Sequence, residues 1–239
     1  MQSSAFLIAI FEFVLLIFSL SVHECAHAWT ASLLGDQTAR LEGRVTLNPM
    51  YHVDPIGTLL FPALMIFGPF LGLGFFGGML VGWAKPTPVI TRNFRKIRRD
   101  DNLVTMAGPA SNLLIAIISV LILIVLCFTL PNGRDVVLES FAATLRGVDG
   151  FLPNPLVLLC TLAILINLSL FLFNLLPIPP LDGSRLTRNL LPYNMVQVYD
   201  RIPGLVSYLL MIFLGGWFIS IFLRPAIRFI FSVLIHIHG

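Results

Sequence analysis

Long apolar runs dominate this sequence and restrict what it can fold into. They occupy residues 5–34, 56–82, 102–130, 154–178 and 204–238. A helix needs about 20 apolar residues to cross a bilayer, and the backbone of a crossing segment must satisfy its own hydrogen bonds. Only 11% of the 239 residues are charged, against about 25% in a typical soluble domain. The sequence therefore predicts an all-α polytopic membrane protein.

No segment has the composition of a separate soluble domain. We expect a single membrane domain over residues 1–239, with its core at 5–190 and a C-terminal membrane segment at 204–238. The net charge of +3 suits basic loops beside an anionic lipid bilayer. It does not suit nucleic-acid binding, because no basic patch is interleaved with aromatic residues. The cysteines lie in apolar sequence, where we expect small core residues and no disulfides; they are Cys25, Cys127 and Cys160.

The first apolar run contains the motif His23-Glu24-Cys25-Ala26-His27. Positions i and i+4 share a helix face, so both imidazoles could bind one metal ion, with Glu24 beside them as a potential general base. Such short patterns also arise by chance. Burying two histidines and a glutamate in hydrocarbon is costly unless something uses them, and this cost favours a metal site.

A catalytic zinc usually has three protein ligands, so the motif leaves one ligand to be found. Asp182 follows Pro177, Pro179 and Pro180, which break a helix and free the backbone to bend toward the interior. From the residues alone, an ordinary Asp-Gly turn explains Asp182 equally well. His52 lies in a polar loop, where a hydrogen bond within the loop is the better interpretation.

Two further charged features have less specific interpretations. Glu12 shares a helix face with His23 but lies about 16 Å away along a straight helix, too far to bind the same metal. We expect it to face the bundle interior. A basic cluster is most simply a cytoplasmic anchor at anionic lipid, with acidic substrate tails as the alternative partner; it comprises Arg92, Arg95, Lys96, Arg98 and Arg99.

Basic residues also flank the apolar run at 56–82 on both sides, and cytoplasmic loops carry an excess of Lys and Arg. If both flanking loops are cytoplasmic, the run enters and leaves on one side. Its halves around Gly68-Pro69 are too short to span. We therefore favour a re-entrant segment over one kinked spanning helix, with the histidines and Asp182 near the cytoplasmic face. The number of spanning helices stays open between about four and six.

Several motifs together resemble one family. His23-Glu24-x-x-His27 and the run NLLPIPPLDG (174–183) resemble the site-2 protease family of intramembrane zinc metalloproteases, peptidase family M50. That family pairs HExxH on one membrane helix with N-x-x-P-x(4)-D-G on a later one. The run AGPASN (107–112) is similar to its G-P-x-x-N element. GRVTLNPMYHVDPIGT (43–58) and GWAKPTPV (82–89) resemble a compact branch without PDZ or CBS domains.

The resemblance implies one Zn²⁺ per chain, held by His23, His27 and Asp182, with Glu24 as the catalytic base. It places Asn174 near the substrate carbonyl or oxyanion, although an interhelical hydrogen bond is the alternative role. It implies a multi-pass cell-membrane endopeptidase whose partners are transmembrane segments of other proteins. GWAKPTPV would pair with an extended substrate, so we expect short membrane-associated β strands. Oligomeric state is not predicted.

Two other functions could use the same residues. A polytopic metal or ion transporter could use the histidines and Asp182 as an ion relay. Transporters often show internal repeats, and we find none in this sequence. A metal-binding relative that holds substrates without cutting them would not need Glu24.

Overall fold

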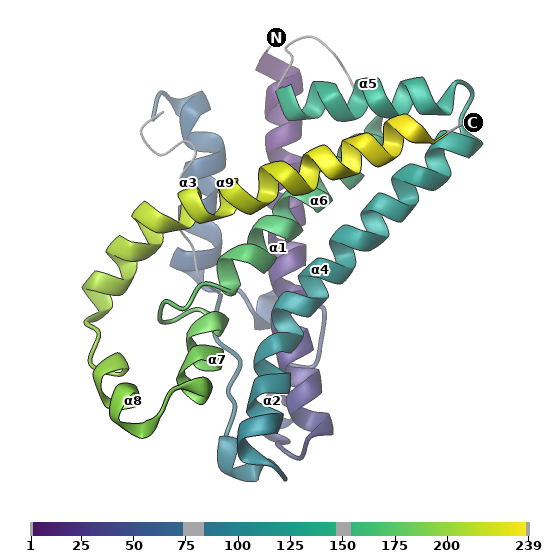
Figure 1. Ribbon diagram of the computed structural model, residues 1–239. Helices are drawn as coiled ribbons and strands as arrows, with labels where there is room; N and C mark the ends of the chain where they lie inside the picture. The colour runs from purple at the N-terminus through teal and green to yellow at the C-terminus, as the bar shows by residue number, and fades with distance from the viewer. Residues whose placement is uncertain (1, 74–83, 147–153, 238–239) are drawn as a thin grey trace.

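A computed structural model describes residues 2–73, 84–146 and 154–237 of the chain (Figure 1). Within these ranges, four helices are long and apolar enough to cross a membrane: α1 (Gln2–Leu33), α4 (Ile97–Thr129), α6 (Pro155–Asn174) and α9 (Gly204–His236). These helices correspond to four of the predicted apolar runs. They confirm an all-α protein of multi-pass type.

The shorter helices lie between these spans. They are α2 (Thr38–Leu41), α3 (Phe61–Phe67), α5 (Gly133–Arg146), α7 (Asp182–Leu190) and α8 (Tyr193–Tyr199). A π-helical turn at Pro55–Leu60 precedes α3, a 3-10 turn at Gly68–Leu71 follows it, and further 3-10 turns occupy Pro49–Tyr51 and Thr91–Asn93.

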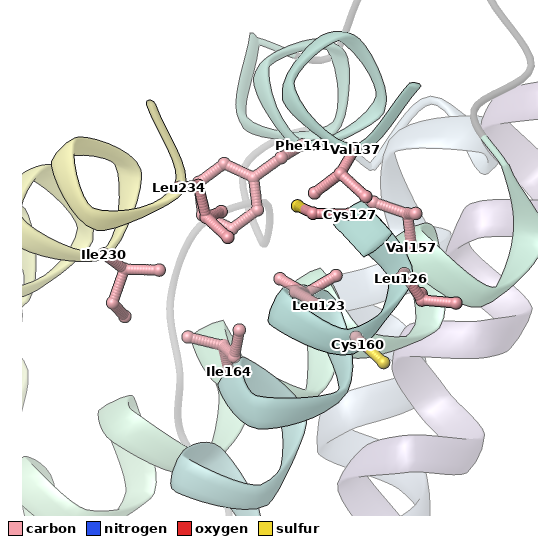
Figure 2. Close-up of a cluster of buried hydrophobic side chains, with 10 residues drawn as sticks. All are labelled: Leu123, Leu126, Cys127, Val137, Phe141, Val157, Cys160, Ile164, Ile230 and Leu234. Atoms are coloured by element: carbon pink, nitrogen blue, oxygen red, sulfur yellow. The ribbon is translucent and has the colours of Figure 1, made fainter. Parts of the chain in front are cut away.

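Helices α1, α4 and α6 form the central bundle, and α4 packs against both of the others. Figure 1 shows α4 beginning beside the lower part of α1 and diverging from it, while α9 crosses in front of the bundle. Figure 2 shows the main hydrophobic cluster, where α5 and the end of α9 cover α4 and α6. Cys127 and Cys160 are buried in this cluster as free thiols, which confirms the prediction for both.

The re-entrant interpretation of residues 56–82 is not supported. The described part is one helical run from Pro55 to Leu71 that passes through Gly68-Pro69 without the predicted break. Pro69 occupies the first turn of the 3-10 segment, a position that tolerates proline. A returning arm would fall in residues 74–83, which lie outside the described residues.

The short β strands are not found in the described ranges. In the segment 43–58, side chains and local turns satisfy the backbone instead of a ladder. Arg44 donates to the Tyr51 carbonyl, His52 Nε2 contacts the Thr46 carbonyl at 2.8 Å, and Asn48 caps the following turn. The part of GWAKPTPV that is described, from Ala84 onward, is neither helix nor strand.

Helices extend further than local composition indicates. The apolar run at 204–238 contains a glycine pair, Gly215-Gly216, and a proline, Pro225, but α9 continues through all three. The segments between the apolar runs, at 131–153 and 179–203, include α5, α7 and α8. Val137 and Phe141 of α5 are both fully buried, four residues apart on one face, so packing on the bundle stabilises this short helix.

Candidate metal centre

The two histidines of the motif lie on one face of α1. His23 and His27 are both buried, and their Nε2 atoms are 3.1 Å apart. The ring planes are nearly perpendicular, at 82°. This is the arrangement expected from i, i+4 spacing on a helix.

Asp182 reaches the same point from a distant part of the chain. Helix α6 ends at Asn174, and the three prolines that follow keep the backbone out of a helix until α7 begins at Asp182. Asp182 Oδ2 lies 3.1 Å from His23 Nε2 and 3.4 Å from His27 Nε2. The sequence prediction that these three residues meet is thus matched by a single cluster.

The hydrogen bonds behind the rings decide which nitrogens face Asp182 without a proton. His27 Nδ1 lies 2.7 Å from the carbonyl of Val104, which can only accept, so Nδ1 carries the proton. His23 Nδ1 lies 2.6 Å from Asn112 Oδ1, and the amide nitrogen of Asn112 donates elsewhere. In neutral rings, both Nε2 atoms are then without a proton and can bind a metal ion.

Three ligand atoms that converge on one point in this way can hold a cation between them. Asp182 Oδ2 is buried and, in the described part of the chain, accepts no hydrogen bond. Tetrahedral zinc with ligand bonds of about 2.1 Å separates its ligand atoms by about 3.4 Å, close to the spacings at this site. The residues fit a zinc ion.

Helix α4 approaches the histidines at Gly108. A methyl group at this position would lie 2.3 Å from His27 Nε2 and 2.5 Å from His23 Nε2. Only hydrogen fits there, because α4 passes directly over the point where the ligand atoms meet. Gly108 is the glycine of the G-P-x-x-N element, so the motif marks a close approach of backbone to the site.

The asparagine of the same element orients His23 within a buried polar network. Asn112 Nδ2 donates to Asn167 Oδ1 at 2.9 Å, and Asn167 Nδ2 donates to Ser19 Oγ at 2.9 Å. All three of these residues are fully buried, and they come from α4, α6 and α1. The network connects the three helices of the bundle and fixes the acceptor that His23 requires.

We expect Asn112→Leu to weaken zinc binding by about 10- to 100-fold, the usual effect of losing a hydrogen-bond partner of a metal-binding histidine. Leucine has a similar volume but leaves His23 Nδ1–H without its acceptor and Asn167 Oδ1 without its donor. Competition titration of the purified protein with a zinc chelator measures the change. An unaltered zinc affinity would show that Asn112 does not orient the ligand.

A second set of contacts holds the helix that begins with Asp182. Asp101 on α4 accepts a hydrogen bond from Arg185 Nη2 at 2.6 Å and another from Asn189 Nδ2 at 2.7 Å. Both donors lie on α7, one turn apart. Because α4 also accepts from His27 and His23, one helix sets the positions of all three candidate ligands.

Glu24 is half-buried beside the histidines and contacts the segment after the second apolar run. Thr87 donates to Glu24 Oε2 twice, from its backbone nitrogen at 3.1 Å and from its hydroxyl at 2.8 Å. The segment containing Thr87 stands out in the sequence by its family resemblance, but the sequence does not predict this contact. No local signal announces it, because 63 residues separate the two positions.

The remaining candidate residues lie elsewhere. Asn174 is half-buried at the end of α6, and its Nδ2 donates to the Leu170 carbonyl of the same helix at 3.0 Å. The helix ends at Asn174 and does not continue toward Asp182. The oxyanion role of Asn174 stays a prediction. His52 is buried and hydrogen-bonded within its loop, as expected.

Comparison with known sequences gives the family. The sequence model of peptidase family M50 matches residues 11–215, which include the whole cluster described above. The chain belongs to peptidase family M50. This agrees with the resemblance carried by the HExxH and N-x-x-P-x(4)-D-G motifs.

Individual M50 relatives agree with this assignment. The chain is 41% identical over 179 residues to a Bacillus subtilis protein named "Putative zinc metalloprotease YwhC", covering 75% of this chain and 68% of that protein. It is 30% identical over 208 residues to a Mycobacterium tuberculosis protein named "Putative zinc metalloprotease Rip2", covering 85% and 68%. No solved structure matches the chain. The family and the names of these relatives support a zinc metalloprotease. The four apolar helices agree with a membrane protein.

Proposed function

We propose that this chain is an intramembrane zinc endopeptidase that cuts peptide bonds in or near transmembrane segments of other proteins. One observation carries the proposal. Three potential ligand atoms from α1 and α7 converge at 3.1–3.4 Å inside a bundle of helices long enough to cross a membrane. Since one chain supplies all three ligands, the proposal includes one zinc ion per chain.

The chemistry divides between the ion and the side chains. A bound Zn²⁺ would lower the pKa of water and polarise the scissile carbonyl. Glu24 lies on α1 beside both histidines. Its carboxylate would be the group that takes a proton from that water and returns it to the leaving amine. Asn174 is the proposed donor to the oxyanion, in place of its present bond to the Leu170 carbonyl.

The site is proposed to lie near the cytoplasmic face. The exposed basic cluster, residues 92–99, leads into α4. His27 is hydrogen-bonded to Val104, about one and a half helical turns beyond Arg99. Because basic residues gather on the cytoplasmic side of membrane proteins, this proximity supports a site near that side.

Residues 85–88, just before the basic cluster, can pair with an extended substrate through only some of their backbone groups. Lys85 donates its amide hydrogen to the His52 carbonyl, and Thr87 donates its own to Glu24. Pro86 and Pro88 have no amide hydrogen. Residues 85–88 therefore offer only carbonyl acceptors, and a substrate backbone paired there must supply the N–H donors.

The experiment is cleavage of a reporter transmembrane protein by the purified chain in lipid nanodiscs. We expect cleavage to disappear when a chelator removes the metal and to return when one equivalent of zinc is added. The zinc-loaded protein should also melt at a higher temperature than the stripped protein, because the ion binds only the folded site. Zinc transport into sealed vesicles without any cleavage would overturn the proposal in favour of a transporter.

A further inference from the structure

Residues 84–94, here called the strap, lie beside the end of α1 without forming a helix or strand before the 3-10 turn at Thr91–Asn93. Their far end is fixed by packing. Phe94 is buried in a small hydrophobic cluster with Ala31 of α1 and Val104 of α4. The strap thus ends in the crevice between the two helices that carry and orient the histidines.

Asp36 holds the strap by hydrogen bonds. It is fully buried just beyond α1, outside the apolar span. Its Oδ2 accepts from the Ile90 amide at 2.7 Å, and its Oδ1 accepts from Asn93 Nδ2 at 2.8 Å. Thr38 adds its hydroxyl and its amide on Oδ1. Burial raises the pKa of Asp36, but these hydrogen bonds lower it by more, so the carboxylate stays ionised.

The backbone beside Asp36 is shaped for this contact. Gly35 has φ +116°, a conformation that side chains rarely adopt, and a methyl group there would lie 2.9 Å from the Asn93 carbonyl oxygen. The chain therefore turns tightly after α1 and lies directly against the strap. At the other end of the strap, Lys85 is held by the His52 carbonyl at 2.9 Å.

Between these two attachments the strap contacts the proposed catalytic base. Thr87 donates to Glu24 Oε2 from both its hydroxyl and its amide, and its hydroxyl also contacts the Glu24 carbonyl at 3.2 Å. Two donors on one oxygen restrict the carboxylate to a single orientation and leave the other oxygen, Oε1, for proton transfer.

We propose that the strap, fixed by Asp36, sets the orientation of Glu24, with Asp36 and Thr87 as positioning residues. The inference rests on the proposed function, because it takes Glu24 as the base. It predicts that loosening the strap slows the chemical step and leaves the zinc ligands in place, since none of the three ligands hydrogen-bonds to the strap in the described part of the chain.

Asp36→Asn tests the proposal. Both oxygens of Asp36 accept hydrogen bonds. Asparagine replaces one of these oxygens with an NH2 group, whose N–H donors would face other N–H or O–H donors. Asp54→Asn is the matched control. Asp54 accepts the amides of Ile56 and Gly57 through Oδ1 alone, at the start of a helical segment where asparagine caps equally well.

Two measurements are made on the zinc-loaded chain in nanodiscs. Hydrogen–deuterium exchange of the peptide covering residues 84–94 reports whether the strap is held. The cleavage kinetics of the reporter and the amount of bound zinc report how the strap affects the site. For Asp36→Asn we expect exchange to accelerate and kcat to fall, each by about tenfold or more, with KM and zinc content unchanged. Asp54→Asn should match the wild type in all measurements.

Thr87 gives an independent variant in case Asp36→Asn folds poorly. Thr87→Val keeps the backbone donor to Glu24 and removes the hydroxyl, so we expect kcat to fall about threefold to tenfold without a change in KM. Thr87→Ser keeps both donors and should restore kcat.

Several results would overturn the proposal. Accelerated exchange with full kcat would mean that the strap does not orient Glu24. Lost zinc, or a change confined to KM, would assign Asp36 to the metal site or to substrate binding. Should the wild-type protein cleave nothing, the proposed function fails. Hydrogen–deuterium exchange then tests the contacts of the strap alone. Glu24→Ala must accelerate exchange of the Thr87 amide and leave the Ile90 amide protected.

Discussion

Glu24→Gln is expected to lower the turnover number for reporter cleavage by about 10²- to 10⁴-fold, the usual contribution of a general base. Glutamine keeps the size of the side chain and its acceptor oxygen, so Thr87 can still donate to it. It cannot take a proton from water. The three candidate ligands are untouched, so bound zinc, measured by atomic absorption, should stay at the wild-type ratio.

The control for this substitution is Glu139→Gln. Glu139 is an exposed carboxylate on α5, the helix that covers the end of the bundle containing the cluster of Figure 2. The Glu139→Gln variant should cleave the reporter at the wild-type rate. Full activity of Glu24→Gln with zinc bound would show that another group accepts the proton, and the proposed mechanism would then be wrong.

Gly108→Ala should lower zinc affinity by more than about 100-fold and abolish cleavage. The added methyl would meet both ligand nitrogens at 2.3 and 2.5 Å, well inside van der Waals contact. The rings cannot swing aside cheaply, because α4 itself holds them through Val104 and Asn112. Either α1 and α4 separate or the rings leave their positions, and both changes spread the ligand atoms.

A matched substitution separates this effect from general damage to a helix. Gly216→Ala also adds a methyl inside a long apolar helix, but no atom lies within 4 Å of the new carbon. We expect it to bind zinc and cleave as the wild type does. Chelator competition gives the affinities, and circular dichroism checks that both variants keep their helices. Wild-type zinc binding by Gly108→Ala would contradict the close packing of α4 on the histidines.

The residue pattern predicted the elements that depend on local composition. The apolar runs at 5–34, 102–130 and 154–178 fold as α1, α4 and α6, with ends shifted by a few residues. Length and hydropathy suffice there, because each segment satisfies its own backbone and faces lipid or other helices. Helix α5 was missed because it is short and mixed in composition, although Val137 and Phe141 marked its buried face.

The family motifs also predicted which side chains gather, namely His23, His27 and Asp182. Their spacing on one helix accounts for the histidines. Only the resemblance joined Asp182 to them, since an Asp-Gly turn after prolines occurs in many proteins. The sequence did not predict where helix α6 ends relative to Asp182, because the backbone from Leu175 to Leu181 follows turns that tertiary contacts select.

The sequence by itself determined the apolar spans of this protein, its helical class and the residue types available for a metal site, because hydropathy and ligand type are properties of single residues. The tertiary structure alone decided how that site is held. Gly108 over the histidines, Asn112 behind His23, Asp101 on α7 and the Asp36-bound strap against Glu24 all join residues far apart in the chain. Such contacts depend on how helices pack, and no local pattern encodes that packing.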